Sequence, residues 1–190
     1  GQFAGSVLLS DTEMERRTPP RPETGAISPL AGTVLGAPFR AALAAGDNRV
    51  LSGEVYLLEE QGMSVISDID DTIKITEVRD RHATLRNTFL RAFQPVSGMA
   101  EFYQTLARSN GAAFHYLSAS PWQLYEPLAA FVRTNGFPAG TFALKKFRWK
   151  DKSFFSLFAN PEKHKSGVIE PLLKQFPKRK FILIGDSGES

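Results

Sequence analysis

The chain has 190 residues and a hydrophobic fraction of 42%, which is enough for one domain with a proper core plus an extension. It contains no cysteine, which excludes disulfides, thiolate zinc sites and thiol nucleophiles. The net charge of +3 favours anionic partners but does not separate phosphorylated metabolites, lipid headgroups and nucleic acid. No run approaches the roughly 18 apolar residues of a membrane span, so we expect a soluble, cytoplasmic protein.

Residues 1–49 carry no dense motif. The stretch from Thr18 to Pro29 is rich in proline and typical of a loop, whereas Val50 to Leu58 alternates like a strand. We therefore predict that residues 1–49 form an N-terminal extension, or the tail of a β-rich module followed by a linker. Residues 50–190 are predicted to form the main domain.

The most informative stretch is Ser64 to Lys74, where an apolar strand leads directly into three aspartates. Clustered carboxylates repel one another, and a bound Mg²⁺, which prefers oxygen ligands, would relieve this repulsion. A calcium-binding EF-hand loop beginning at Asp68 is excluded, because Ile73 and Arg79 occupy the positions that need Gly and Glu. A solvated acidic turn after an edge strand is the structural alternative to a metal site.

Two helices are predicted after the aspartates. From Thr76 to Phe93, apolar side chains recur at helical spacing between arginines, which favours an amphipathic helix with solvated arginines over a phosphate-binding cap. Ser97 has the chemistry of a helix N-cap, so the second helix is expected to run from Met99 to Arg108 and to end at Asn110 and Gly111.

The next strand is predicted from Ala112 to Leu117, ending on Ser118. A serine nucleophile elbow needs glycine two places on either side of the serine, whereas Tyr116 and Ser120 stand there. Ser118 is therefore not expected to be a nucleophile. A helix from about Gln123 to Thr134 and a short strand from Thr141 to Leu144 are predicted to follow.

The segment from Lys145 to Phe158 interleaves basic and aromatic residues. Such a mixture suits an anionic membrane surface or nucleic acid bases. We favour aromatic residues in the core with solvated lysines, because the segment joins two elements that must pack on the sheet. A helix is then predicted from Glu162 to Gln175, and a buried strand from Phe181 to Ile184 ends just before Asp186.

This alternation of strands and helices predicts an α/β fold in which parallel strands carry helices on both faces. In such folds, ligands bind outside the carboxyl ends of the strands. Asp68, Ser118 and Asp186 would each lie at such an end, with Lys165 approaching from a helix. Carboxylates, a hydroxyl and an amine in this arrangement are typical of metal-assisted phosphoryl transfer.

The pattern Asp-x-Asp-x-Thr after an apolar strand resembles the first motif of the haloacid dehalogenase superfamily. The resemblance implies that Asp68 attacks a phosphorus atom, and that Asp70 protonates the leaving oxygen and then activates water. Thr72 would hold the turn and Asp70 in place. Asp186 matches the superfamily's fourth motif and would bind Mg²⁺ together with Asp68 and the main-chain carbonyl of Asp70.

Two further positions match the second and third motifs of this superfamily. Ser118, with Ser120 as a weaker candidate, would hydrogen-bond a phosphoryl oxygen. Lys165, with Lys163 as a near alternative, would balance the charge of the aspartate and of the phosphate. Neither position carries a signal by itself, and each gains its meaning from its place relative to the predicted strands.

Three stretches together resemble one family, the App1-like phosphatidate phosphatase domain of bacteria and fungi, which is related to the lipin catalytic domain. They are Ser64 to Lys74, Tyr116 to Tyr125 and Phe176 to Glu189. The resemblance implies a haloacid dehalogenase-like Rossmannoid three-layer sandwich with a minimal cap. It also implies Mg²⁺-dependent conversion of phosphatidate to diacylglycerol and phosphate. Because the family's fourth motif continues with a further acid, the domain is expected to be incomplete at its C-terminal end.

The expected partner is phosphatidate or another phosphomonoester, and the sequence indicates no oligomeric state. If the substrate is a lipid, Lys145 to Phe158 and the arginines from Arg79 to Arg91 are candidates for peripheral contact with an anionic membrane. Two alternatives are a soluble phosphomonoesterase with the same mechanism and a phosphatidate-binding module without turnover. Nucleic acid is not expected as a partner, because the carboxylate cluster would repel a phosphate backbone.

Overall fold

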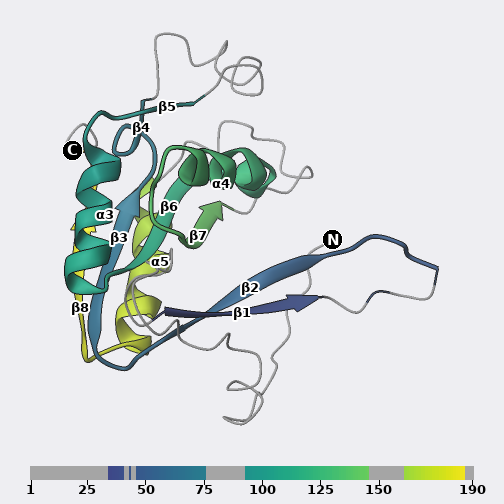
Figure 1. Cartoon of the computed structure of the whole chain (residues 1–190), viewed down its shortest axis with the longest axis horizontal. Helices are drawn as coiled ribbons and strands as arrows, with labels where there is room; N and C mark the ends of the chain where they lie inside the picture. Colours follow the sequence, from purple (N-terminus) through teal and green to yellow (C-terminus); the bar gives the residue numbers. More distant parts are fainter. Residues whose placement is uncertain (1–33, 41–42, 44–45, 76–92, 146–160, 187–190) are drawn as a thin grey trace, which may run out of the picture.

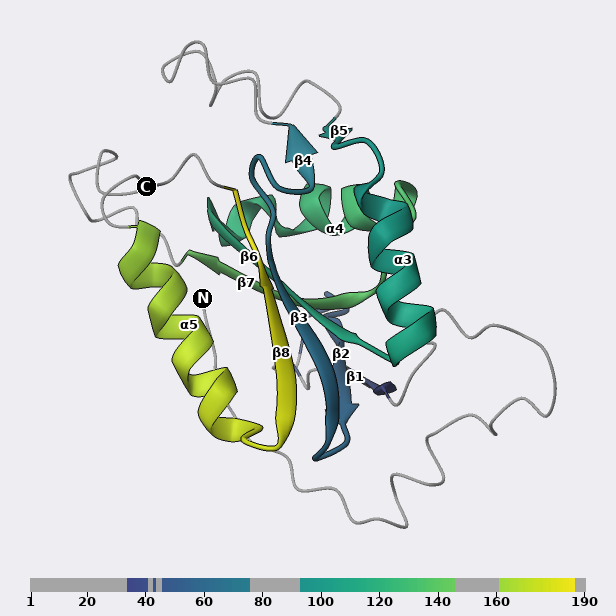
Figure 2. The same cartoon turned by 90° about the vertical axis from the view of Figure 1, so that its left-hand side faces the viewer.

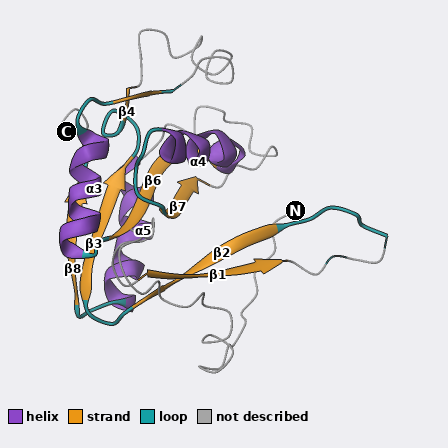
Figure 3. Cartoon of the chain, viewed as in Figure 1, coloured by secondary structure: helices purple, strands orange, loops and turns teal. Residues whose placement is uncertain are grey.

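The computed structural model describes residues 34–40, 43, 46–75, 93–145 and 161–186. Within these ranges, strands and helices alternate along the main domain (Figure 3). The predicted helix from Thr76 to Phe93 lies almost wholly outside the described residues, as does the basic and aromatic segment from Lys145 to Phe158. No described helix has the length and apolar character needed to cross a membrane.

A four-stranded parallel sheet forms the centre of the domain (Figure 1). Its strand order is β7-β6-β3-β8. The sheet confirms the prediction of an α/β fold built on parallel strands. The four strands are β3 (Gly62–Asp68), β6 (Ala113–Pro121), β7 (Gly140–Lys145) and β8 (Arg179–Ile184).

Helices cover both faces of this sheet. Figure 2 shows α5 (Pro161–Gln175) on one side, and α3 (Met99–Asn110) and α4 (Tyr125–Thr134) on the other. The chain steps from β3 to β6 to β7 in one direction and then returns to β8 on the far side of β3. Because such crossovers are right-handed, this reversal places α5 on the opposite face. The reversal also creates a switch point between β3 and β8, which is where ligands bind in open α/β sheets.

The core lies mainly between the sheet and the face that carries α3 and α4. Strand β3 is almost continuously buried from Ser64 to Asp68, as expected for a central parallel strand covered on both faces. Aromatic side chains fill much of the space on the α3 side, where the rings of Tyr103 and Phe114 lie 5.3 Å apart. Packing of these rings fixes α3 against β6.

The first two described strands form an antiparallel hairpin outside the central sheet, β1 (Val34–Arg40) and β2 (Ser52–Leu58) (Figure 1). Strand β2 confirms the strand predicted from Val50 to Leu58. The hairpin pairs residues from both sides of the predicted division at 49/50, and that division remains a prediction. A second small pair, β4 (Lys74–Ile75) and β5 (Gln94–Pro95), lies beyond the carboxyl end of β3.

The turn between β2 and β3 is held by Arg179, whose side chain is buried at the start of β8. Its guanidinium donates to the carbonyl oxygens of Glu59, Gln61 and Met63 and to the Ser64 hydroxyl, at 2.6–3.0 Å. A guanidinium has five donors in a rigid plane, so a single side chain can satisfy several carbonyls of one turn. Arg179 therefore ties the amino end of β3 to β8.

Two element ends differ from the prediction. The N-cap of α3 is Gly98, not Ser97, and no side chain caps this helix. Gly98 has a φ of 81°, a left-handed conformation that glycine adopts without strain, so the chain can turn sharply from β5 into the helix. Strand β6 does not stop at Ser118 but continues to Pro121, with a shift in its pairing to β7 between these two residues. A 3₁₀ turn, η1 (Trp122–Leu124), then leads into α4.

Candidate active site at the carboxyl ends of the strands

Asp68 is the last residue of β3 and lies at the carboxyl edge of the sheet, beside the switch point. Its side chain is only 8% exposed, so its charge needs a nearby countercharge. Lys165 of α5 supplies one, with Nζ 3.3 Å from Oδ2 of Asp68. The structure thus brings together two predicted residues that are 97 positions apart in the sequence.

The main chain of Asp68 is fixed from the opposite face of the sheet. Ser67 Oγ donates to the Asp68 carbonyl at 2.7 Å and lies 2.7 Å from the Tyr103 hydroxyl. Because a serine hydroxyl has one proton and Ser67 uses it on the carbonyl, Tyr103 is the donor to Ser67. Burial raises the pKa of Tyr103 to about 12, which keeps the phenol protonated for this role. A buried chain of two hydroxyls therefore holds the end of β3.

Both carboxylate oxygens of Asp70 are contacted by neighbouring side chains. Ser118 Oγ donates to Oδ2 at 2.6 Å, and Lys74 Nζ lies 2.7 Å from Oδ1. The Lys74 side chain is 8% exposed, and its ammonium lies 5.1 Å from the centre of the Phe93 ring, which adds a cation–π contact. With both oxygens engaged, the Asp70 carboxylate is held in one orientation.

The loop after β3 folds back on itself and brings Lys74 to Asp70. The backbone N–H groups of Ile73 and Lys74 both donate to the Ile69 carbonyl, and the Asp71 N–H donates to the Lys74 carbonyl. Asp71 has a φ of 54°, a left-handed conformation that Asp and Asn tolerate better than most residues. This tight turn explains how a lysine four residues after Asp70 can reach its carboxylate.

Ser118 lies at the carboxyl end of the sheet as predicted, but its hydroxyl is already used within the protein. It donates to Asp70 and accepts a hydrogen bond of 2.9 Å from the Ser120 backbone N–H. The pairing shift in β6 lies at this point, and such irregularities commonly redirect side chains near active sites. Ser120 thus contributes its main chain here. The predicted contact of Ser118 with a phosphoryl oxygen would require its single proton to leave Asp70.

The side chain of Thr72 forms no hydrogen bond with Asp70 in the structure, and its role in holding the turn stays a prediction. Its Oγ1 is buried and has no hydrogen-bond partner among the described residues, while Ser118 and Lys74 contact the Asp70 carboxylate. The reason is the fold-back of the loop, which brings Lys74 onto Asp70 and leaves Thr72 in the buried interior of the turn. Lys163, the alternative to Lys165, has a side chain outside the described residues.

Asp186 follows β8 and is exposed at the same edge of the sheet. Because Ile184 pairs with Ser67, Asp186 and Asp68 both come after the paired ends of neighbouring parallel strands. Among the described residues, no three His, Cys, Asp or Glu side chains lie together as a metal cluster. The predicted set has two carboxylates and one main-chain carbonyl, and these hard oxygen donors suit Mg²⁺, which usually keeps several waters.

The sequence prediction missed three residues at this site. Lys74 follows the aspartates, and the only sequence signal for its pairing with Asp70 is their spacing of four residues. That spacing usually indicates an ion pair only in a helix, and this segment is a turn. Ser67 and Tyr103 meet only through the packing of α3 on β3. Nothing in the local sequence distinguishes them from ordinary core residues.

A parallel sheet that gathers acids and lysines at the carboxyl ends of its strands has the architecture of an α/β enzyme domain rather than of a structural module. The comparison with known families makes this assignment specific. The family model of the phosphatidate phosphatase APP1 catalytic domain matches residues 63–190, and the chain belongs to this family. The match begins at β3 and includes every candidate site residue described above.

Two curated relatives are similar over the same region. Phosphatidate phosphatase APP1 of Saccharomyces cerevisiae is 41% identical over 132 residues, and an uncharacterised protein of Schizosaccharomyces pombe is 31% identical over 140 residues. These alignments cover 67% and 72% of this chain but only 22% of each relative. A chain from the solved structure of a Pnkp1/Rnl/Hen1 complex aligns at 14% identity over 76% of this chain and 58% of its own length. Its TM-score of 0.37 is too low to bear on fold or function.

Proposed function

We propose that the protein is a Mg²⁺-dependent phosphatidate phosphatase that works through an aspartyl-phosphate on Asp68. The proposal rests on one combined observation: the chain belongs to the APP1 catalytic-domain family, and two of its aspartates are held separately at the carboxyl edge of the sheet. Asp68 faces a lysine from α5, and Asp70 is oriented by Ser118 and Lys74. We also propose that the fold is haloacid dehalogenase-like.

In the proposed reaction, a carboxylate oxygen of Asp68 forms a bond to phosphorus while the bond from phosphorus to the leaving alcohol oxygen breaks. For this step Asp70 must carry a proton, so one of its oxygens first leaves Ser118 or Lys74. Asp70 gives that proton to the leaving oxygen, which departs as the alcohol. Asp70 then takes a proton from a water molecule that attacks the phosphorus. Inorganic phosphate leaves, and the Asp68 carboxylate is restored.

Lys165 would offset the negative charge that Asp68 and the phosphate bring together. Mg²⁺, when bound by Asp68, Asp186 and the Asp70 carbonyl, would supply further charge stabilisation to the phosphate oxygens. The engagement of the Asp70 side chain by Ser118 and Lys74 supports a set in which Asp70 offers its main chain to the metal. A phosphatidate substrate would bring the protein to the surface of an anionic membrane.

The test is phosphate release from phosphatidate in mixed micelles, with and without Mg²⁺, for the wild type and Asp68→Asn. We expect Asp68→Asn to lose at least about 1,000-fold in kcat, because an amide cannot form the acyl-phosphate intermediate. Asp71→Asn is the matched control: it makes the same chemical change three residues away, at an exposed residue whose left-handed conformation asparagine accepts. It should retain most of the activity.

Two results would redirect the proposal. Release of phosphate from water-soluble esters but not from phosphatidate would assign a soluble phosphomonoesterase. Binding to phosphatidate vesicles without release of phosphate from any substrate, unchanged in Asp68→Asn, would assign a binding module without turnover.

A further inference from the structure

Asp68 lies at the point where β3 loses one of its two neighbouring strands. The register of β3 with β6 still includes Asp68, whose partner is Leu117, but the register with β8 ends one residue earlier, at Ser67. Among the described residues, Asp68 therefore has a paired strand residue on one side only. A reacting side chain must be held closely in place, so the main chain of Asp68 depends on further contacts at this point.

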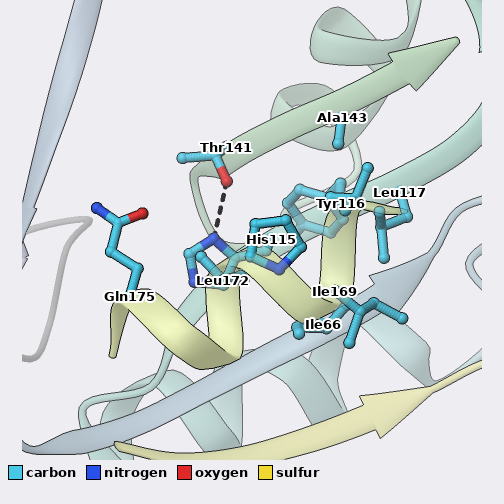
Figure 4. A pocket seen from close by; sticks show the side chains of 11 residues that line it. Ile66, His115, Tyr116, Leu117, Thr141, Ala143, Ile169, Leu172 and Gln175 are labelled. Atoms are coloured by element: carbon cyan, nitrogen blue, oxygen red, sulfur yellow. Dashed lines mark hydrogen bonds between the residues drawn. The ribbon is translucent and has the colours of Figure 1, made fainter. Parts of the chain in front are cut away.

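The two faces of the sheet hold Asp68 in different ways. Side chains alternate along a strand, so Ile66 and Asp68 point to one face and Ser67 points to the other. Figure 4 shows Ile66 in the wall of a pocket against α5, the face on which Lys165 meets the Asp68 carboxylate. On the α3 face, Ser67 Oγ donates to the Asp68 carbonyl and accepts from the Tyr103 hydroxyl, each at 2.7 Å. The side chain of Asp68 is thus contacted from α5 and its main chain from α3.

Tyr103 gives this chain of hydrogen bonds a fixed direction. The side chains of Tyr103 and Ser67 are both fully buried, so water does not compete for either hydroxyl. The Tyr103 ring packs against Phe114 and Phe137, with ring centres 5.3 Å and 5.8 Å away, which fixes where its hydroxyl points. Because Tyr103 is the donor to Ser67, the single Ser67 proton is directed to the Asp68 carbonyl. In such a buried chain, each hydrogen bond also strengthens the next.

We propose that Tyr103 and Ser67 are positioning residues that set the place of Asp68 for attack on phosphorus. Both side chains are fully buried, so they act through the main chain of Asp68 and not on the substrate. A displacement of about 1 Å at a reacting group can lower a rate about 100-fold, so a contact on the nucleophile's own carbonyl affects the rate. The inference rests on the proposed function, because it takes Asp68 as the nucleophile.

The test compares Tyr103→Phe with Tyr116→Phe, which make the same chemical change on the same face of the sheet. Tyr116 is also fully buried, and its hydroxyl also donates to a neighbour at 2.7 Å, but that neighbour is the Pro138 carbonyl before β7. It lies on β6 next to Leu117 and pairs in register with Ser67 (Figure 4). The two variants therefore lose equivalent hydrogen bonds, and only one of these bonds leads to the nucleophile.

We expect Tyr103→Phe to lower kcat for phosphatidate about 5- to 10-fold with KM changed less than about twofold, because the loss of one buried hydrogen bond affects the nucleophile and not substrate binding. Tyr116→Phe should keep kcat within about twofold of the wild type. Both variants should lose a similar amount of Tm, because each loses one buried hydrogen bond. A purely structural role of Tyr103 would make the two variants alike in kcat as well.

Ser67→Ala shows whether the two residues act as one unit. It removes the donor to the Asp68 carbonyl, and we expect kcat to fall about tenfold. Adding Tyr103→Phe to Ser67→Ala should then change kcat less than about twofold, because the tyrosine acts through Ser67. Losses that multiply in the double variant would overturn the proposal.

A measurement without substrate keeps this inference apart from the proposed function. The ¹³C resonance of the Asp68 carbonyl is read by NMR through the Ile69 amide, and we expect it to shift in Tyr103→Phe but not in Tyr116→Phe. The proposal is overturned if this resonance is the same in the wild type and Tyr103→Phe, or if an active wild type and both tyrosine variants have equal kcat. Absence of phosphate release from every ester by the wild type would instead overturn the proposed function, and with it the role of the two residues in catalysis.

Discussion

The ammonium of Lys74 lies 2.7 Å from a carboxylate oxygen of Asp70, and the lysine side chain is only 8% exposed. The other oxygen of the same carboxylate accepts a hydrogen bond from Ser118, which comes from a different strand. Asp70 is thus held between its own loop and β6. In the proposed reaction Asp70 moves protons, and proton transfer requires that the carboxylate be positioned within hydrogen-bond reach of the reacting oxygen.

We expect Lys74→Met to lower kcat about 10- to 100-fold with little change in KM, because it removes a charged hydrogen bond that orients Asp70 without touching substrate. The matched control is Lys178→Met. Lys178 also lies 2.7 Å from a carboxylate, that of Glu60, but both side chains are more than half exposed. Such surface pairs contribute little, so Lys178→Met should be nearly neutral. Equal losses in the two variants would contradict a positioning role for Lys74.

Steady-state kinetics can separate the two possible roles of Ser118. Its hydroxyl donates to Asp70 in the structure, so we expect Ser118→Ala to lower kcat about tenfold or more with KM changed less than about twofold. A rise in KM at constant kcat would instead support the predicted contact with a phosphoryl oxygen. Ser120→Ala is the control, because Ser120 contributes its backbone N–H and the substitution preserves it.

Arg179 is expected to control stability rather than catalysis. Its guanidinium donates to three carbonyls and one hydroxyl of the turn that enters β3, all far from the carboxyl edge. Arg179→Met should lower the free energy of unfolding by about 3 kcal/mol and Tm by about 10 °C, because the buried acceptors lose their donor. Thermal denaturation measures this change. The exposed neighbour Lys180 is the control, and a comparable loss in Lys180→Met would rule out the proposed clamp.

His115 should make stability depend on pH. Burial, the larger cause, lowers its folded-state pKa to about 4, against about 6.5 in the unfolded chain. Between these values the unfolded state binds more protons, so stability falls as pH decreases from about 6.5 to about 4, by at most about 3 kcal/mol. Urea denaturation at several pH values should show a smaller decrease for His115→Phe than for the wild type. Parallel curves for the two proteins would mean that His115 is not the titrating group.

Much of the fold could be predicted from local sequence. The apolar run before Asp68, the strand ending near Ser118 and the strand before Asp186 are each short, β-rich and followed by polar residues, which is typical of buried parallel strands. The predicted helix spans agree with α3, α4 and α5 to within a few residues at their ends. Helix and strand periodicities are local properties, so a single sequence contains them.

The sequence alone also placed Asp68, Ser118 and Asp186 at strand ends and Lys165 on a helix, because the polar residues interrupt the apolar periodicity at those points. Only the tertiary structure decided their partners. The fold-back after β3 brought Lys74 to Asp70, and the packing of α3 joined Tyr103 to Ser67. Such contacts depend on loop geometry and on residues far apart in the chain, and no local pattern encodes them.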